Sequence, residues 1–404
     1  MKPAGIITPS QFDSVPQLTA AWPASSDSRT PRALEERGVT FSEVLANVAG
    51  LDQGTLRPIN RWQQLNFLKT SSAPRVVFPW TQGRLETMRG VDVPDAQLTA
   101  GGHRAGRAMS LADYPRPPQD NGWGVHWIPT VAQPPEVVDE YVKRAVAMGM
   151  KWVVFLNDGA NIGANDYLVK RLTAAGIEPV MRVYMPGLTP ISGDLQAMVR
   201  HYVGLGVHYF QLYNEPNLMV ETGGQPPDVS RYLDLWLPAA EQVVAAGGLP
   251  GFGALSPQGE MDDRIFLREA LAQLKARGQV HILDHAWLAM HNYTGARPLD
   301  DPDGFLRFRQ YDAIIQSELG RQLPIIGTEG GTHISEHVSQ EQQIKMVTQS
   351  YNYMRHREPY NFAYTYWIIA NGHDPAWENH ALFRADGPTA LAQALTTLAT
   401  GGRV

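Results

Sequence analysis

The chain contains no cysteine among its 404 residues. Disulfides, thiolate metal sites and cysteine nucleophiles are therefore excluded, although this absence does not fix the redox compartment. The HExxH pattern of zinc-binding helices is also missing from the sequence. We therefore expect no metal site.

Charged residues are scarce, at 18% of the chain against a usual value of about 25%. The formal net charge is −6, and no long run of Lys and Arg with interleaved aromatic residues is present, so we expect no nucleic-acid partner. The first residues carry a single Lys and break at Pro9 without a continuous apolar segment. Neither a secretory signal nor a membrane span is expected, and the default location is cytoplasmic.

Glycine and proline are plentiful, with 37 and 30 residues, which suits a fold with many long loops. The chain also has 10 Trp and 15 Tyr residues, whose rings can stack on sugars. At 404 residues it exceeds what one hydrophobic core usually fills. We therefore expect either one large domain with an appendage or two domains.

The sequence changes character near residue 120. Before that point it is punctuated by Pro, Ser, Asp and Gly, with helix-compatible stretches at 32–46 and 58–68 and one strand-like run at 75–80. We interpret residues 1–120 as an N-terminal extension or linker that is partly disordered. Residues 121–404 are interpreted as one folded domain.

Beyond residue 120, short apolar runs alternate with amphipathic stretches. Runs with strand character begin near residues 124, 151, 178, 207, 251, 283, 324 and 361. Helical periodicity follows at 134–150, 167–175, 195–205, 231–246, 263–276, 305–319, 340–356 and 388–398. Eight such alternations over roughly 280 residues predict an α/β fold, the (β/α)₈ TIM barrel. A doubly wound open sheet is disfavoured because residues 159–163 contain neither GxGxxG nor GK[ST].

Two glutamates stand at the ends of apolar strands. The alternating run that begins at Tyr209 leads straight into Asn214-Glu215-Pro216, and the apolar run at 324–328 ends in Glu329 followed by two glycines. In a barrel the C-terminal ends of the strands share one face, so both carboxyl groups are expected in one cleft. Two carboxyl groups are what the hydrolysis of a sugar acetal requires.

These motifs carry a family resemblance. The Asn-Glu-Pro turn at 214–216 ends the fourth strand, Glu329 ends the seventh, and His-Asn-Tyr at 291–293 ends the sixth. Together they resemble the signature of clan A glycoside hydrolases, which are retaining enzymes on a (β/α)₈ barrel, and most of all the cellulase-like and xylosidase-like families. The resemblance extends from about residue 121 to the C-terminus.

The resemblance implies a role for each motif residue. Glu215 is implied to be the acid/base and Glu329 the nucleophile, while Asn214 is implied to bind the sugar 2-hydroxyl. Tyr293 is implied to donate a hydrogen bond to Glu329. Many clan members also place an Arg on the second strand in contact with the nucleophile, but this chain has none there, and Arg182 on the third strand is the nearest replacement.

Four further substrate-binding or tuning candidates have structural alternatives, and one loop is a further candidate. Trp367 ends the eighth strand, where its indole can stack on a pyranose or simply pack in the core. His126 and Asn157 can line the mouth and bind hydroxyl groups, or make ordinary loop hydrogen bonds. His291 can tune Glu215 or be a core histidine. The loop at 373–380 can rim the cleft.

We therefore predict a retaining glycoside hydrolase that cleaves a β-linked O-glycosidic bond through a covalent glycosyl-enzyme. An oligo- or polysaccharide is the expected substrate, water is the second reactant, and no cofactor is needed. One alternative is a transglycosylase that uses the same two glutamates with a sugar hydroxyl as acceptor. The other is a non-catalytic carbohydrate-binding barrel, against which the intact glutamate pair argues.

Overall fold

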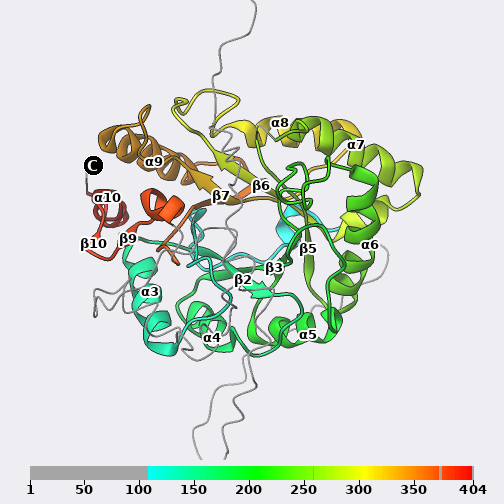
Figure 1. Cartoon of the computed structure of the whole chain (residues 1–404), viewed down its shortest axis with the longest axis horizontal. Helices are drawn as coiled ribbons and strands as arrows, with labels where there is room; N and C mark the ends of the chain where they lie inside the picture. Colours follow the sequence, from blue (N-terminus) through cyan, green and yellow to red (C-terminus); the bar gives the residue numbers. More distant parts are fainter. Residues whose placement is uncertain (1–107, 258, 373–374, 403–404) are drawn as a thin grey trace, which may run out of the picture. The chain divides into compact units, whose positions relative to one another are not determined.

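The computed structural model describes residues 108–402, except 258 and 373–374, and the segments expected at 32–46, 58–68 and 75–80 lie outside this part. The described residues form a closed barrel of eight parallel strands in sequence order, with helices around it (Figure 1). The barrel closes because β1 (Trp123–His126) pairs with β8 (Asn361–Tyr366). The predicted TIM barrel is thus confirmed, and the open sheet is ruled out.

The remaining barrel strands are β2 (Trp152–Asp158), β3 (Glu178–Tyr184), β4 (Tyr209–Leu212), β5 (Leu249–Leu255), β6 (Trp287–Tyr293) and β7 (Ile325–Gly331). The α-helices of the described part are α3 (Pro135–Ala147), α4 (Asp166–Ala174), α5 (Leu195–Leu205), α6 (Val229–Ala245), α7 (Asp263–Ala276), α8 (Arg307–Leu319), α9 (Gln340–Met354) and α10 (Ala390–Ala399). A short hairpin of β9 (Phe383–Arg384) and β10 (Gly387–Pro388) precedes α10.

Two cores hold the barrel together. On β2, Trp152 and Val154 belong to the cluster that fills the barrel interior, whereas Val153 and Phe155 belong to the larger cluster between the strands and the helices. This alternation follows from the period of two in a strand, and because both faces are buried the strands read as continuous apolar runs.

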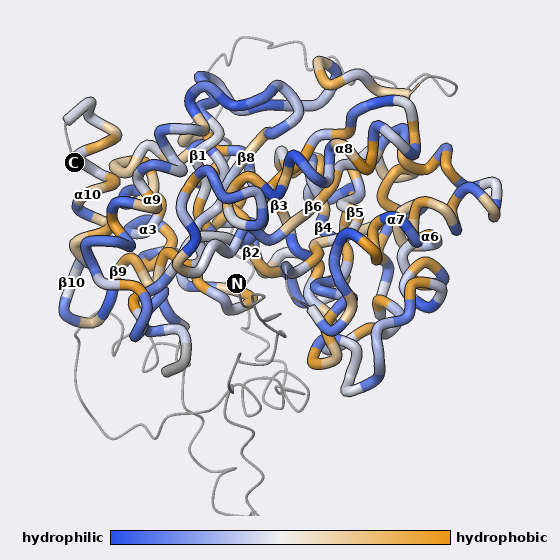
Figure 2. Tube along the Cα trace, turned by 90° about the horizontal axis from the view of Figure 1, so that it is seen from above, coloured by the Kyte–Doolittle hydropathy of each residue, from blue (hydrophilic) through white to orange (hydrophobic). Residues whose placement is uncertain are grey.

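The helices begin and end where local chemistry favours it. Asp194 and Asp262 accept hydrogen bonds from backbone N–H groups at the starts of α5 and α7, and Ser339 forms a capping box at the start of α9. Hydrophobic and hydrophilic positions alternate along the helices (Figure 2), as expected for helices that cover a core on one side. In the described part of the chain, no helix has the length and apolar character needed to cross a membrane.

The start of the sixth strand differs from the prediction. The sequence places it near residue 283, but Val280–Asp284 forms a 3-10 turn and β6 begins only at Trp287. Ile282 and Leu283 are buried within that turn. A short apolar run signals burial and cannot by itself distinguish a strand from a turn that packs on the core.

Residues 108–121, at the end of the predicted extension, pack on the barrel. The Tyr114 side chain is 3% exposed, lies in the interior cluster and donates a hydrogen bond to the Ala286 carbonyl at 2.7 Å. Asp120 accepts hydrogen bonds from the Trp152 indole at 2.8 Å and from Arg357 at 2.8 Å. Because Trp152 is the first residue of β2, this segment closes the N-terminal end of the barrel, opposite the strand ends that carry the glutamates.

Candidate active site

Glu215 and Glu329 line one cavity of about 580 Å³ at the C-terminal ends of the strands. Both side chains are largely buried, at 8% and 6% exposed. One carboxylate oxygen of each residue and a ring nitrogen of His291 all lie within 4.8 Å of one another. The two glutamates that lie far apart in the sequence are therefore neighbours in the cleft.

A strained turn presents Glu215. Tyr213 and Glu215 have φ angles of 64° and 39°, in the left-handed region that residues other than glycine rarely adopt. The Glu215 N–H donates to the Ala254 carbonyl at 3.0 Å, which ties the turn to β5. Asn217 continues this attachment, since its side chain donates to the Ser256 carbonyl at 2.8 Å and accepts from the Ser256 N–H at 3.0 Å. The neighbouring strand thus holds the backbone in the conformation that aims Glu215 into the cleft.

The two glycines after Glu329 let β8 approach closely. A Cβ atom on Gly330 would lie 2.7 Å from the ring of Tyr364, and one on Gly331 would lie 2.5 Å from the ring of Tyr366. Gly331 also has a φ of 102°. Any other residue would push β8 away and move Glu329 with it.

Two side chains fix the Glu329 carboxylate. Arg182 donates to its Oε1 at 2.8 Å, and the Tyr293 hydroxyl donates to its Oε2 at 2.8 Å. The resemblance implied a Tyr293 hydrogen bond to this carboxylate, and Arg182 on the third strand contacts it where the resemblance implied an Arg from the second strand. Burial, followed by the negative charge of Glu329, raises the pKa of Tyr293 well above its usual value, so this hydroxyl stays protonated as a donor.

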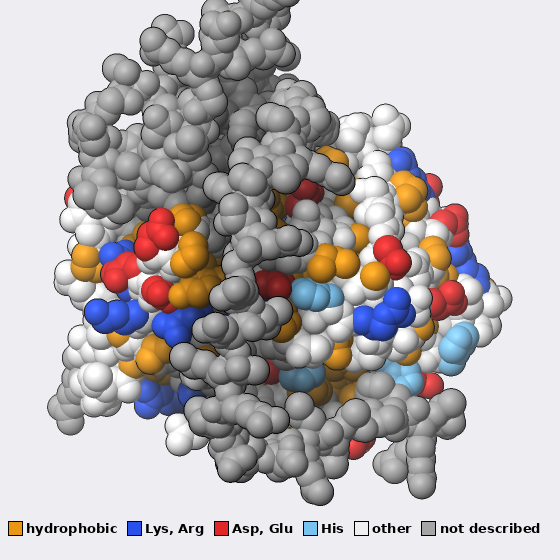
Figure 3. Space-filling view, turned by 90° about the horizontal axis from the view of Figure 1, so that it is seen from below, with side chains coloured by type: hydrophobic (Ala, Val, Ile, Leu, Met, Phe, Trp, Pro, Cys, Tyr) orange, Lys and Arg blue, Asp and Glu red, His pale blue; other side chains and the backbone are white. Residues whose placement is uncertain are grey.

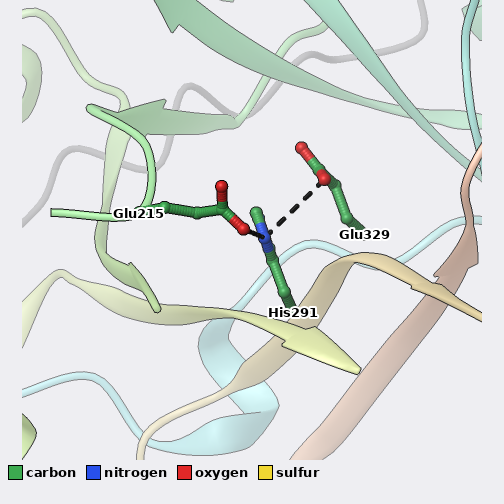
Figure 4. A group of neighbouring side chains, drawn as sticks. All are labelled: Glu215, His291 and Glu329. Atoms are coloured by element: carbon green, nitrogen blue, oxygen red, sulfur yellow. Dashed lines mark hydrogen bonds and ion pairs between the residues drawn. The ribbon is translucent and has the colours of Figure 1, made fainter. Parts of the chain in front are cut away.

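His291 lies between the two glutamates, as Figure 4 shows. Its Nδ1 is 2.8 Å from Glu215 Oε1 and 3.7 Å from Glu329 Oε2. Burial alone would lower the pKa of His291, but the two carboxylates outweigh it and raise that pKa. Burial likewise opposes ionisation of Glu215, yet the charge and hydrogen bond of His291 outweigh it and lower the pKa of Glu215. Both shifts favour the shared proton on the His291 side of the pair.

One group in the described part of the chain offers ligand atoms to a metal ion, and it consists of Glu215, His291 and Glu329. Every carboxylate oxygen of the pair already accepts a hydrogen bond, however: Glu329 from Arg182 and Tyr293, and Glu215 from His291 and, at 3.5 Å, from Asn214. A cation here would have to displace these donors and compete with the Arg182 charge. The arrangement suits proton transfer and nucleophilic attack better than metal binding.

The other predicted site residues divide into those that line the cavity and those that lie outside its lining. Asn214 and Trp367 line the cavity with the glutamates. His126 is fully buried and packs against Trp367 with ring centroids 4.4 Å apart and planes tilted by 59°, while its Nδ1 lies 3.0 Å from the Trp127 carbonyl oxygen. Burial lowers the pKa of His126 to about 4.

Asn157, like His126, lies outside the cavity lining. Its amide donates to the carbonyls of Gly159 and Asn161 at 2.9 and 3.0 Å, and its oxygen accepts from Asn165 at 2.9 Å. The side chain therefore shapes the loop after β2. Neither Asn157 nor His126 is among the residues that line the cavity.

Aromatic and imidazole rings form one wall of the cavity. The predicted rim loop at 373–380 supplies Trp377 and His380, although residues 373–374 lie outside the described part. His333 stacks on His380 with ring centroids 4.0 Å apart, and Trp377 packs edge-on against Trp367 at 5.5 Å. Burial lowers the pKa of His333, and burial with the neighbouring His333 lowers the pKa of His380 to about 3, so both imidazoles are neutral.

Sequence reasoning missed His333 and Tyr184 as lining residues. Tyr184 is the last residue of β3, and the rule that strand ends form the site in a barrel was enough to nominate it. His333 lies two residues beyond the end of β7, in a loop whose course the sequence does not reveal.

Solved structures share this fold. A monomeric β-xylosidase from Caulobacter crescentus CB15 is 17% identical over 72% of this chain and 69% of that chain, with a TM-score of 0.50. A GH39 β-xylosidase from Caulobacter crescentus is 16% identical over 73% of each chain, and a GH39 enzyme from Xanthomonas axonopodis pv. citri is 15% identical over 75% and 72%; each has a TM-score of 0.51.

No family model and no curated protein sequence matches the chain. The likeness to the solved structures shows a common fold.

Proposed function

We propose that this protein is a retaining glycoside hydrolase that cleaves a β-linked O-glycosidic bond. The observation that carries the proposal is the distance of at most 4.8 Å between carboxylate oxygens of Glu215 and Glu329 in one cavity. Retaining enzymes need about 5–5.5 Å between the two groups, whereas inverting enzymes need roughly 6.5–9.5 Å to admit a water molecule. The β-xylosidases among the solved structures of this fold support the β linkage.

In the first step Glu329 attacks the anomeric carbon as the bond to the leaving group breaks, and Glu215 gives a proton to the departing oxygen. In the second step Glu215 takes a proton from water, which attacks the same carbon and releases Glu329. The sugar emerges with its configuration retained because two inversions have occurred. Arg182 and Tyr293, which hold Glu329 through both of its oxygens, orient it for attack.

The Glu215–His291 pair supplies the proton for the first step. The two carboxylates carry two negative charges, and the Arg182 guanidinium and the shared proton balance them. The site therefore carries this proton without an unpaired buried charge. When a sugar fills the cleft and excludes water, transfer of the proton from His291 to Glu215 and on to the leaving oxygen completes the acid step.

The test uses the full-length chain with a panel of aryl β-glycosides, and follows the anomer released by NMR at early times. We expect hydrolysis of at least one sugar with a β-product first. The inverted anomer would overturn the retaining mechanism, and absence of turnover with retained sugar binding would favour a carbohydrate-binding barrel. Release of a longer glycoside when an acceptor sugar is added would identify transglycosylation. The Glu215→Gln/Glu329→Gln double variant is the control for contaminating activity.

A further inference from the structure

The two sides of the cleft differ in chemistry. Around the proposed nucleophile the lining is aromatic. The backbone N–H of Trp367 donates to the Gly330 carbonyl at 2.9 Å, which places Trp367 next to Glu329. Trp377 and His380 continue this wall of the cavity. Aromatic rings of this kind stack on the C–H faces of sugars. This side therefore suits the sugar whose anomeric carbon Glu329 attacks.

Around Glu215, apart from Asn214, Tyr184 and Glu221, the lining is mainly aliphatic. The Leu218 N–H donates to the Glu215 carbonyl at 2.9 Å, so Leu218 lies in the same turn as the proposed acid/base. Leu218 and Val220 both line the cavity, and Val220 is 54% exposed in the described part. An aliphatic side chain so exposed at the wall of a cavity is available for contact with an apolar group.

A second loop extends this aliphatic wall. Met185, Pro186 and Gly187, which follow β3, also line the cavity. A Cβ atom on Gly187 would lie 3.5 Å from the carbonyl oxygen of Glu221 and 3.8 Å from the nitrogen of Gly223, so the loop after β3 lies against the loop after β4. Pro257, after β5, adds a further apolar side chain to the lining.

The loop after β4 is built to hold its shape. The Met219 carbonyl accepts from the Thr222 hydroxyl at 3.0 Å and from the Gly224 N–H at 2.8 Å. The Met219 N–H donates to Glu260 Oε2 at 2.9 Å. Hydrogen bonds within the loop and to its neighbour thus fix the backbone on both sides of Val220, and the exposure of Val220 is a property of an ordered wall.

We propose that this aliphatic wall binds the leaving group, and that the substrate is a β-glycoside of an alcohol with a hydrocarbon body. The inference rests on the proposed function, because only the role of Glu215 as acid/base places the leaving oxygen beside this wall. A sugar in the same position would set its hydroxyl groups against Leu218, Val220, Met185, Pro186 and Pro257. These side chains offer no hydrogen bonds, and desolvated hydroxyl groups without partners weaken binding. Glu221 is the charged exception among the lining residues of these loops.

The experiment uses the sugar that the aryl panel identifies and compares its methyl, butyl, hexyl and octyl β-glycosides below their micelle concentrations. We expect kcat/KM to rise by about two- to fourfold for each of the first few added methylenes, because each buried methylene favours binding by a nearly constant increment. The glycoside whose leaving group is a second sugar is expected to be hydrolysed more slowly than the butyl glycoside.

Val220→Asn tests the wall, and Val146→Asn is the matched control. Val146 is the same residue type, is 51% exposed and lies on the distant helix α3. The ratio of octyl to methyl kcat/KM should fall several-fold in Val220→Asn and stay at the wild-type value in Val146→Asn. Because the readout is a ratio, a general loss of folded protein does not imitate it.

The outcomes separate this inference from the proposed function. Hydrolysis that is indifferent to chain length, or faster with a sugar as leaving group, overturns the apolar leaving-group site while the glycosidase stands. An equal fall of the octyl-to-methyl kcat/KM ratio in Val220→Asn and Val146→Asn also overturns the apolar leaving-group site. Absence of hydrolysis of every aryl and alkyl glycoside overturns the proposed function, and the leaving-group site falls with it.

Discussion

At the scale of single residues, the two glutamates are held by cations of different kinds. Glu329 is paired with the Arg182 guanidinium at 2.8 Å. Glu215 is paired with His291, whose imidazole can release its proton. The first arrangement orients a carboxylate oxygen for attack, and the second keeps a proton available for transfer. The chemical difference between the two partners matches the roles proposed for the two glutamates.

Removing each glutamate should therefore have a distinct effect. Glu329→Ala lacks the attacking oxygen, and we expect turnover to fall by several orders of magnitude while sugar binding survives. Glu215→Ala should still form the glycosyl-enzyme from an activated aryl β-glycoside, which needs little protonation, and added azide should release the β-glycosyl azide. Azide with Glu329→Ala should instead give the α-azide. Product anomers by NMR decide between the roles, and full activity in either variant contradicts both.

The pH dependence should report the Glu215–His291 pair. Because carboxylates raise the pKa of His291, the pair keeps its proton below that raised pKa and loses it as the pH rises through it. Activity on a glycoside with a poor leaving group should therefore fall as the pH rises above the raised pKa of His291. In His291→Gln the Glu215 carboxyl must hold the proton alone, so we expect the basic limb of kcat/KM to move to lower pH.

His126→Asn is the control for this profile. Burial holds the pKa of His126 at about 4, so its charge does not change where the basic limb lies. The limb should stay at its wild-type position in this variant. An unchanged limb in His291→Gln would show that His291 does not hold the catalytic proton.

At the scale of elements, the C-terminal end of β7 is the least tolerant part of the site. Gly330 has no room for a Cβ, since Tyr364 of β8 and Asn292 of β6 surround it. We expect Gly330→Ala to cost about 1–3 kcal/mol of unfolding free energy, as overpacking usually does, and to lower kcat/KM by displacing Glu329.

Gly204→Ala is the matched control for this substitution. Gly204 lies in α5, and nothing approaches its added Cβ within 4 Å. Alanine favours the helix, so we expect stabilisation of about 0.5–1 kcal/mol with unchanged activity. Urea unfolding measures both variants. An equal response at the two positions would contradict the close approach of β8 to β7.

At the scale of the whole molecule, the barrel depends on the segment that precedes it. Tyr114 fills the N-terminal end of the interior, and the Tyr209 hydroxyl donates to the Pro115 carbonyl at 2.5 Å. The regular sequence pattern alone predicts that a chain beginning near Pro118 folds and hydrolyses its substrate. The packing of Tyr114 and Met109 on the interior cluster, and the Met109 N–H hydrogen bond to the Asp284 carbonyl at 3.0 Å, instead predict that a stable chain includes these residues.

We expect a chain beginning at residue 118 to be less stable than one beginning at 108. In the full-length protein, Tyr114→Ala should cost about 3–5 kcal/mol, as buried aromatic truncations do. Tyr114→Phe, which removes only the hydrogen bond to Ala286, should cost about 1 kcal/mol. Denaturant midpoints measure all three comparisons. Equal stability of the two shortened chains would show that Tyr114 contributes little to the barrel.

The barrel and its glutamate pair could be predicted because the signals for them are local. Buried parallel strands read as short apolar runs, and α5 and α7 have the predicted bounds because capping residues mark their starts. The strand-end positions of Glu215 and Glu329 then follow from the barrel rule. The contacts of Arg182 and Tyr293 with Glu329 followed from the resemblance.

Other features were decided by tertiary structure alone. Whether Asn157 faces the cleft or its own loop depends on backbone carbonyls that the fold brings near it, and the same holds for the burial of His126 beneath Trp367. The pairing of His333 with His380 and the aliphatic wall beside Glu215 join loops from different strands. The sequence by itself determined the scaffold and the strand-end glutamate pair, since periodicity and strand ends are properties of single segments. The lining of the cleft depends on contacts between segments, which only the folded chain creates.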